Sequence, residues 1–359
     1  MLRSVALGYA DLFRACISVT LPVMVSVERC YIQIWETKME TELLREEEFA
    51  GRFSIGDFLA ACHRAFVLYG QGEIVNPPRE QVVDQRGALD YFGLDMPAEW
   101  TGKYRARKII EEFSDVKEGR LAKREAYISF EDLQNGRKLR LDAGFITDMR
   151  TGAAGALGIK YVAGTGIRRV AVLGTGRVAR NLALACDELF KLQEICCTSR
   201  KAENRAAFAA EIGPKLTAEL RMEESIAACV DGVQAVLVAV PTPEPILTEA
   251  LLAGVGFVAV IAGDGRTRQV APEVLKERGV LVDVLEQAKK SGEFRAAGEA
   301  KEMDAICLAR DGGGAVLNIG DAACGRLGDT APSVVYLTGM GAQDLCAAAM
   351  IYERMGIAK

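Results

Sequence analysis

Three basic residues stand where an unpaired cation is costly. Arg79 follows two prolines, Lys108 precedes two isoleucines in an apolar stretch, and Arg150 stands among Gly and Ala residues. Burying Lys or Arg is unfavourable unless an opposite charge or hydrogen bonds compensate it. Each residue alone is typical of a structural ion pair. The three together would suit an anionic group, such as the carboxylate of a substrate.

An aspartate follows an apolar stretch further along the chain. Asp264 stands in the segment AGDGRTR (262–268), directly after the apolar residues 256–262. Doubly wound parallel sheets bind ligands at the carboxyl ends of their strands. Asp264 could therefore be a general acid or base, or it could cap a helix. Both interpretations remain open.

The stretch VAVLGTGRVARNLALA (170–185) contains the pattern G-x-G-x-x-A. Alone, the pattern could be a simple turn between a strand and a helix. Here a β-branched strand precedes it and a helix follows, as a dinucleotide site requires. The helix start would offer free backbone N–H groups to phosphate. We expect cofactor contacts from Gly174, Thr175, Gly176, Arg177, Val178 and Ala179.

The end of the next strand indicates which dinucleotide binds. NAD sites usually place a carboxylate there for the ribose hydroxyls. This chain instead has Ser199, Arg200 and Lys201 after Thr198. A guanidinium matches phosphate geometry, so we expect NADP(H), with NAD(H) as the alternative; a solvated basic turn is the other interpretation. Further cofactor contacts are expected from Val240 and Gly339.

Apolar strands alternate with helical stretches around this motif, which is typical of a parallel sheet covered on both faces. We therefore predict an α/β fold with a Rossmann-type doubly wound sheet. Its expected strands are 168–174, 194–199, 234–240, 256–262 and 279–284, with helices at 177–190 and 203–212. Upstream we expect helices at 54–73 and 146–163, an extended segment at 75–83, and strands at 107–114 and 124–133 before a hairpin turn at 134–138. The tail, 334–355, returns to a strand–glycine–helix pattern.

The composition is that of a globular protein. Of 359 residues, 50% are hydrophobic and 26% are charged, and the net charge of −5 argues against a broad nucleic-acid surface. One His and scattered cysteines predict no metal site. The adjacent Cys196 and Cys197 are expected to be buried free thiols, which favours the reducing cytoplasm.

The first 38 residues lie outside the enzyme-like pattern. Their apolar run, 15–27, is too short to cross a membrane, and we expect no membrane partner. We expect residues 1–38 to be an N-terminal extension or the result of an early start codon, with Met39 as the true start. A signal peptide is the less favoured alternative.

From about residue 41 onward the chain resembles the ornithine cyclodeaminase/μ-crystallin family. The landmarks of the resemblance are PPR (77–79), MP (96–97), RKII (107–110), ITDMRTGAAGALGIKYVA (146–163), VLGTGRVAR (172–180), AGDGRTR (262–268) and LTGMGAQDLCAAA (337–349). The resemblance implies a homodimer acting on a carbon–nitrogen centre next to a carboxylate. It also implies a discontinuous α+β substrate and dimerisation domain, for which we expect residues 39–153 and 326–359, around a Rossmann domain of residues 154–325.

The resemblance also implies roles for residues. Arg79, Lys108 and Arg150 would hold the carboxylate of a small α-amino or α-imino acid, with Met96 as a further substrate contact. Lys108 and Asp264 would be the catalytic residues, the aspartate acting as acid or base.

Two departures from the family pattern bear on the reaction. Cyclodeaminases carry a carboxylate two positions before the Met of M-P, where this chain has Leu94, followed by Asp95. Neighbours on an extended segment point to opposite sides, so Asp95 need not substitute. The tail also has Leu337 and Gly341 where Ser and Ala are usual. The leading hypothesis is an oxidoreductase of α-amino and α-imino acids. A cyclodeaminase and a crystallin-like binding protein are the alternatives.

Overall fold

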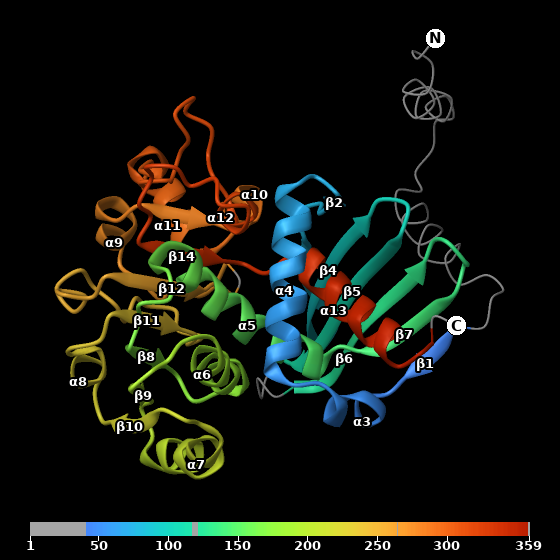
Figure 1. Cartoon of the computed structure of the whole chain (residues 1–359), viewed down its shortest axis with the longest axis horizontal. Coiled ribbons are helices and arrows are strands. Elements are labelled where there is room, and N and C mark those ends of the chain that lie inside the picture. The colour runs from blue at the N-terminus through green and yellow to red at the C-terminus, as the bar shows by residue number, and fades with distance from the viewer. Residues whose placement is uncertain (1–40, 117–120, 264, 358–359) are drawn as a thin grey trace. The chain divides into compact units, whose positions relative to one another are not determined.

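The computed structural model describes residues 41–116, 121–263 and 265–357, which form two β-sheets joined by long helices (Figure 1). The expected extension at residues 1–38 and the candidate catalytic residue Asp264 lie outside these ranges.

One sheet is entirely parallel, in the order β10-β9-β8-β11-β12-β14-β13. Its strands are β8 (Arg169–Leu173), β9 (Glu194–Thr198), β10 (Glu219–Glu223), β11 (Ala235–Val238), β12 (Phe257–Ile261), β13 (Val280–Val282) and β14 (Val334–Leu337). The chain proceeds outward from β8 through β9 to β10 in one direction and from β11 through β12 in the other, where β14 lies between β12 and the edge strand β13. The order therefore reverses between β8 and β11, where such sheets bind nucleotides. The predicted Rossmann-type fold is confirmed.

Successive residues of these strands enter separate cores on the two faces. On β8, Val170 packs in the core under α5 and α6, whereas Ala171 packs in the core of the opposite face. Cys196 and Cys197 divide in the same way, and both are fully buried free thiols, as expected. Burial on both faces explains why the strands are almost continuously apolar.

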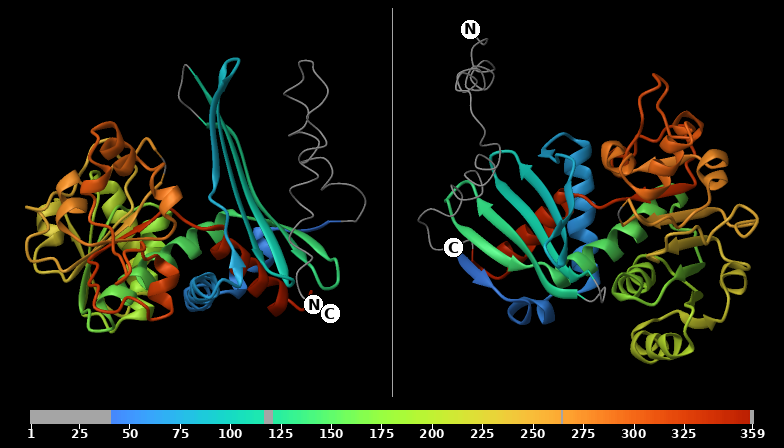
Figure 2. Two further views of the ribbon diagram at one scale, coloured as in Figure 1. Left: turned by 90° about the horizontal axis from the view of Figure 1, so that it is seen from above. Right: turned by 180° about the vertical axis from the view of Figure 1, so that it is seen from behind.

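The other sheet is mainly antiparallel, in the order β1-β7-β6-β5-β4-β2, with β3 also paired to β4. Its strands are β1 (Glu42–Leu44), β2 (Ile74–Val75), β3 (Glu80–Arg86), β4 (Leu89–Trp100), β5 (Tyr104–Asp115), β6 (Leu121–Asp132) and β7 (Lys138–Asp142). Figure 2 shows this sheet from two further directions. The final helix, α13 (Gly341–Arg354), packs against β4, β5 and β6.

Helices α4 (Ile55–Gly70) and α5 (Gly144–Ala163) pack on each other and on α13. The side chain of Ser54 caps α4 reciprocally with Asp57. The other helices are α3 (Glu46–Phe49), α6 (Arg177–Leu189), α7 (Ala202–Ile212), α8 (Ile226–Val230), α9 (Pro272–Glu277), α10 (Leu285–Ala288), α11 (Gly292–Glu299) and α12 (Ile319–Ala323), with short 3₁₀ helices at Ala50–Arg52, Gly213–Lys215 and Met303–Ala305. Over the described ranges, none is long and apolar enough to cross a bilayer.

The strand β14 belongs to the parallel sheet, although it lies within residues 326–359, which the expected division assigned to the other domain. The following helix α13 packs on the antiparallel sheet. The tail thus passes from one sheet to the other, and the division into two domains stays a prediction.

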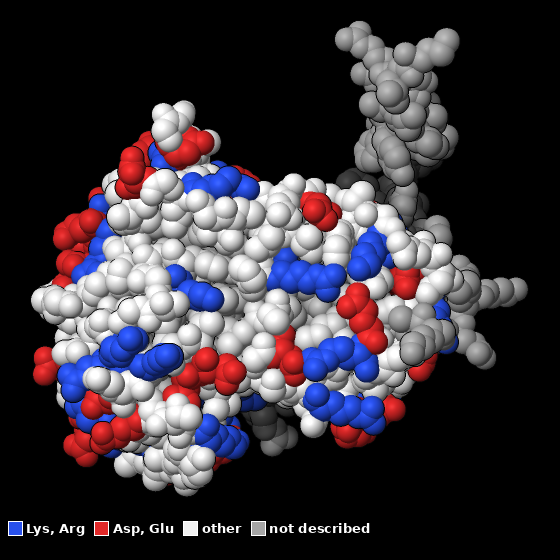
Figure 3. Space-filling view, viewed as in Figure 1, with Lys and Arg blue, Asp and Glu red and all other residues white. Residues whose placement is uncertain are grey.

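On the face seen in Figure 3, basic and acidic side chains are interspersed.

Small residues let α5 pack closely against its neighbours. A Cβ on Gly152 would lie 2.4 Å from the backbone carbon of Asn181 in α6. A Cβ on Gly158 would lie 2.9 Å from a methyl group of Val335 in β14. The Gly- and Ala-rich sequence of α5 therefore has a packing reason, since real Cβ atoms do not approach this closely.

We expect Gly152→Ala to lower the free energy of unfolding by about 1–3 kcal/mol, because the added methyl group would push α5 away from α6. Chemical unfolding followed by circular dichroism would measure the change. Gly56→Ala on α4 is the matched control, since its nearest new contact would be at 3.4 Å. Equal effects of the two substitutions would contradict the packing argument.

Candidate active site

The glycine motif forms a tight turn from β8 into α6. Gly174 has a φ of 112°, and a Cβ there would lie 3.0 Å from the carbonyl oxygen of Ala239. Gly176 is the N-cap of α6, its Cβ position faces open space, and no side chain in the described ranges caps the helix. Ala179 is fully buried beneath the turn. Free N–H groups at an uncovered helix start suit a phosphate group.

The other residues of the motif surround this helix start. Thr175 and Val178 are half-buried, and Arg177 is exposed. The Arg177 guanidinium lies 3.3 Å from Asp148 of α5. Burial raises the pKa of Asp148, and the nearby arginine opposes the rise. Arg177 therefore connects the turn to α5 in addition to any contact with a ligand.

Basic side chains stand at the end of β9, next to this turn. Arg200 and Lys201 are exposed, and the described part of the chain gives neither an ion-pair partner. Ser199 is half-buried, with its hydroxyl 3.4 Å from the carbonyl oxygen of Lys201. Thr198 is different, because it is buried and donates its hydroxyl to the carbonyl of Glu223 at 2.7 Å.

A buried glutamine holds the loop after β11. The backbone N–H of Val240 donates to Oε1 of Gln269 at 2.8 Å, and Nε2 of Gln269 donates to the carbonyl of Ile261 at 2.7 Å. The backbone N–H of Gln269 donates to Glu293, which also accepts from Tyr336. Gln269 thus ties together the loops that follow β11 and β12. We made no prediction for Gln269 or Glu293, whose partners are distant in sequence.

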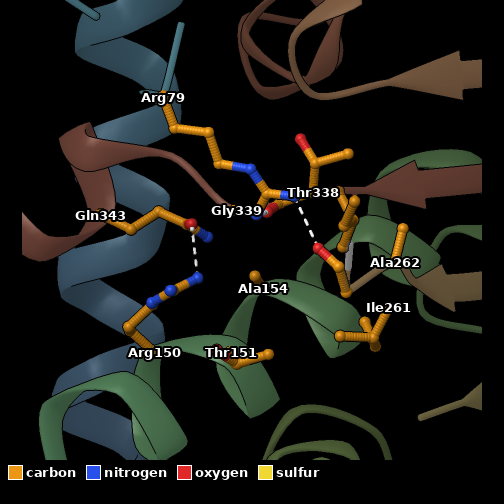
Figure 4. A pocket seen from close by; sticks show the side chains of 11 residues that line it. Arg79, Arg150, Thr151, Ala154, Ile261, Ala262, Thr338, Gly339 and Gln343 are labelled. Carbon is orange, nitrogen blue, oxygen red and sulfur yellow. Dashed lines mark hydrogen bonds between the residues drawn. The ribbon is translucent and has the colours of Figure 1, made fainter. Parts of the chain in front are cut away.

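A cavity of about 170 Å³ opens among α5, the end of β12 and the segment after β14 (Figure 4). Two of the predicted carboxylate ligands, Arg79 and Arg150, line it. The full lining is Arg79, Arg150, Thr151, Ala154, Ile261, Ala262, Gly263, Leu337, Thr338, Gly339 and Gln343. Gly263 immediately precedes Asp264, whose position is not described. Arg79 and Arg150, which come from distant segments, therefore converge on one space, whereas Lys108 and Met96 are not part of its lining.

Backbone carbonyls hold Arg79 at the edge of the cavity. Its guanidinium donates to the carbonyl of Thr338 at 2.6 Å and to that of Gly263 at 2.5 Å. Its backbone N–H donates to Oε1 of Gln287 at 2.9 Å. The side chain is therefore aligned before any ligand binds.

Lys108 lies deeper than the two arginines. Its side chain is 1% exposed, and its Nζ lies 2.9 Å from Oδ2 of Asp344. Met96 pairs with it across β4 and β5 and is 2% exposed. Burial and the nearby Arg150 guanidinium lower the pKa of Lys108 to about 7, although Asp344 opposes the shift. An amine with such a pKa can hold or release a proton near neutrality.

Arg150 shares this carboxylate. Its Nε lies 3.3 Å from Oδ1 of Asp344, and its Nη1 donates to Oε1 of Gln343 at 3.2 Å. Only 7% of the arginine side chain is exposed, against 1% for Asp344. Arg150 is therefore a member of a structural ion pair and also lines the cavity, and binding of an anionic group stays a prediction.

Asp283 and Gln287 support the segment that forms the floor of the cavity. Asp283 accepts from the backbone N–H groups of Thr338 and Gly339, both at 2.7 Å. Gln287 donates to the carbonyl of Gly339 at 2.7 Å. Burial raises the pKa of Asp283, and these hydrogen bonds oppose the rise. We did not predict either residue; the signal in the sequence was a single carboxylate at the end of an apolar strand.

The adjacent residues Leu94 and Asp95 point to opposite faces of the antiparallel sheet, as expected. Asp95 accepts from Nε of Arg107 at 2.8 Å and is paired with it. Leu94 stands opposite Ile110 in the register, two residues from Met96. Asp95 therefore does not occupy the position of Leu94.

Comparisons with known proteins agree with this architecture. The profile of the ornithine cyclodeaminase/mu-crystallin family matches residues 39–358. Alanine dehydrogenase of Archaeoglobus fulgidus is 25% identical over 320 residues, which cover 88% of this chain and 95% of that protein.

Solved structures with the same fold are similar over nearly their whole length. Δ(1)-pyrroline-2-carboxylate reductase of Thermococcus litoralis, in complex with NADH and L-proline, has a TM-score of 0.74 at 20% identity, with 89% of this chain and 98% of that chain covered. An archaeal alanine dehydrogenase dimer with bound NAD has a TM-score of 0.72 at 23% identity, with 89% and 97% covered. From the extent of the profile match, this chain belongs to the ornithine cyclodeaminase/mu-crystallin family.

Proposed function

We propose that this protein is an NAD(P)-dependent oxidoreductase that interconverts an α-amino acid and its α-imino or α-keto partner. The observation that carries the proposal is the convergence of Arg79 and Arg150 on one cavity, with Lys108 buried behind Arg150. The catalysis of such reactions by relatives in the same family supports it.

In this proposal, the two arginines bind the substrate carboxylate. A guanidinium presents two N–H groups to a carboxylate in a planar fork. Arg79 is held by two carbonyls and Arg150 by Asp344 and Gln343, so binding would cost little further ordering. Positioning of this kind can lower a reaction barrier by several kcal/mol.

The glycine turn and the neighbouring loops would hold the dinucleotide. Gly174 and Gly176 leave room for a pyrophosphate at the start of α6, and Val240 and Gly339 lie on loops beside the carboxyl ends of the strands. When bound, the nicotinamide would exchange a hydride with the carbon atom that carries the nitrogen. Lys108 and Asp264 would manage the accompanying proton on the nitrogen or on an attacking water molecule.

We assign a preference for NADP(H) to the basic end of β9. Arg200 and Lys201 are exposed and lack ion-pair partners within the described ranges, so both could face a 2′-phosphate. Solved relatives hold NAD or NADH, and NAD(H) remains the alternative.

A homodimer and a cytoplasmic location are parts of the same proposal. The thiols of the described residues are all free, which suits a reducing compartment.

The sheet face around Lys108 is apolar, which favours an uncharged substrate side chain. Leu94, Met96 and Ile110 share the inner face of the antiparallel sheet with Lys108. No carboxylate from β4 is available there for a distal amine, since Asp95 is paired with Arg107 on the other face. This arrangement favours an oxidoreductase over a cyclodeaminase acting on ornithine or lysine.

We expect the purified protein to change the absorbance of NADPH with a member of a panel of amino acids, 2-oxo acids with ammonia or methylamine, and cyclic ketimines. Lys108→Met should reduce kcat/KM by about 100-fold or more, because it removes the buried proton-carrying group, while NADPH fluorescence titration stays unchanged. Release of ammonia without net NADPH change would instead indicate a cyclodeaminase. Full activity of the variant would refute the assigned role of Lys108.

The cofactor preference can be tested separately. Arg200→Ala should raise the KM for NADPH about tenfold, the equivalent of roughly 1.4 kcal/mol, and leave the KM for NADH nearly unchanged. Steady-state kinetics with both cofactors would measure this. Lys191→Ala removes the same charge from an exposed site just before β9, at the other end of that strand, and serves as the control. Parallel changes with both cofactors would argue against a 2′-phosphate contact.

A further inference from the structure

Asp344 is a buried carboxylate that the proposed reaction does not use. It lies in the first turn of α13 and is 0% exposed. Its two oxygens face two cations from different elements: Oδ2 lies 2.9 Å from Nζ of Lys108 on β5, and Oδ1 lies 3.3 Å from Nε of Arg150 on α5. A buried charge is costly unless it is paired, so this carboxylate and its two cations are mutually dependent.

The shared carboxylate determines where the side chains of the two cations point. With Nε of Arg150 directed at Asp344, the terminal nitrogen Nη1 points to Gln343 in the cavity wall. Lys108 is drawn toward α13 and does not line the cavity. Without Asp344, neither cation would have an ionic partner among the described residues.

The local charge is unbalanced before a ligand binds. The charged and titratable groups that face Lys108 are Asp344 on α13, Arg150 on α5 and Arg79 before β3, with the thiol of Cys62 on α4 close to Arg150. Burial raises the pKa of the Cys62 thiol, which is therefore neutral. The cluster thus holds one carboxylate and three cations when Lys108 is protonated.

We propose that Asp344 is a positioning residue that favours the protonated form of Lys108, and that binding of an anionic substrate increases the protonated fraction of Lys108 further. A ligand carboxylate adds a second negative charge to the cluster and stabilises the ammonium form. The proton comes from solvent and stays on Nζ, ready for the reacting nitrogen. This inference rests on the proposed function, since it requires a carboxylate in the cavity.

Proton uptake can be measured without turnover. Isothermal titration calorimetry of oxamate into the protein saturated with NADPH, in buffers of different ionisation enthalpy, gives the number of protons bound per ligand. The pKa of Lys108, about 7 in the free protein, predicts that uptake begins near this pH and is greatest above it. At high pH uptake should vanish, because the lysine is then neutral in both states.

Asp344→Asn removes the charge that favours the ammonium form. We expect the pH of greatest proton uptake to fall by about one unit or more, since a close opposite charge shifts a pKa by about 1–3 units. Asp132→Asn is the matched control: Asp132 is also a buried carboxylate that contacts α13, but its partners are Tyr352 and Asn135. Its uptake profile should match that of the wild type.

The outcomes separate this inference from the proposed function. If oxamate binds neither the wild-type protein nor any variant, the proposed carboxylate-binding site is wrong, and the proposed function fails with it. If oxamate binds and the profile of Asp344→Asn matches the wild type, only the role of Asp344 is overturned. Should Asp344→Asn fail to fold, Lys108→Met leaves Asp344 paired with Arg150 and should abolish uptake; persistent uptake in that variant would refute the proposal.

Discussion

The short segment between β14 and α13 is the constraint on which the site depends. It carries the chain from the parallel sheet to the antiparallel sheet, and the buried carboxylate of Asp283 holds its first two residues. Three hydrogen bonds to Thr338 and Gly339, between 2.7 and 2.8 Å, occupy the two oxygens. A buried carboxylate that loses such donors pays the full cost of desolvation, so the segment has little freedom to move.

Residues from several elements around the cavity contact this segment or the helix that follows it. Its carbonyls accept hydrogen bonds from Arg79 and Gln287, and the helix that follows brings Asp344 to Lys108 and Arg150. Gly341 makes the passage sterically feasible, because a Cβ there would lie 2.5 Å from the carbonyl oxygen of Pro97 in β4. The close approach of α13 to β4 is therefore available only to glycine.

The buried charged cluster beside the cavity lowers the stability of the fold relative to a fully apolar core. Lys108, Arg150 and Asp344 are almost completely buried, and well-packed apolar side chains in such positions are often at least as stable. In the proposed function, the same pairing would position the cations before an anionic substrate binds. Small residues along α5 offset part of the cost by allowing tight packing against α6 and β14.

Local sequence patterns determined the parallel sheet and the glycine turn. Apolar runs alternating with helical periods specified the Rossmann-type sheet, and the glycine spacing located the turn at Gly174 and Gly176, because both signals depend on residues near one another in the chain. The strand β4 was not predicted, since its Gly93, Asp95 and Pro97 are residue types depleted in strands. Only pairing with its neighbours β2, β3 and β5 makes it a strand.

The sequence likewise identified Arg79, Lys108 and Arg150 as unusual cations, since charge in an apolar context is visible without a structure. It could not reveal that Lys108 lies behind Arg150, or that Asp344 holds both. Nor could it reveal that Asp283 and Gln287 support the segment after β14. Those facts depend on pairings between residues tens to hundreds of positions apart. The packing of α13 against β5 and α5 brings Asp344 to the two cations, and the pairing of β13 with β14 brings Asp283 to the segment after β14.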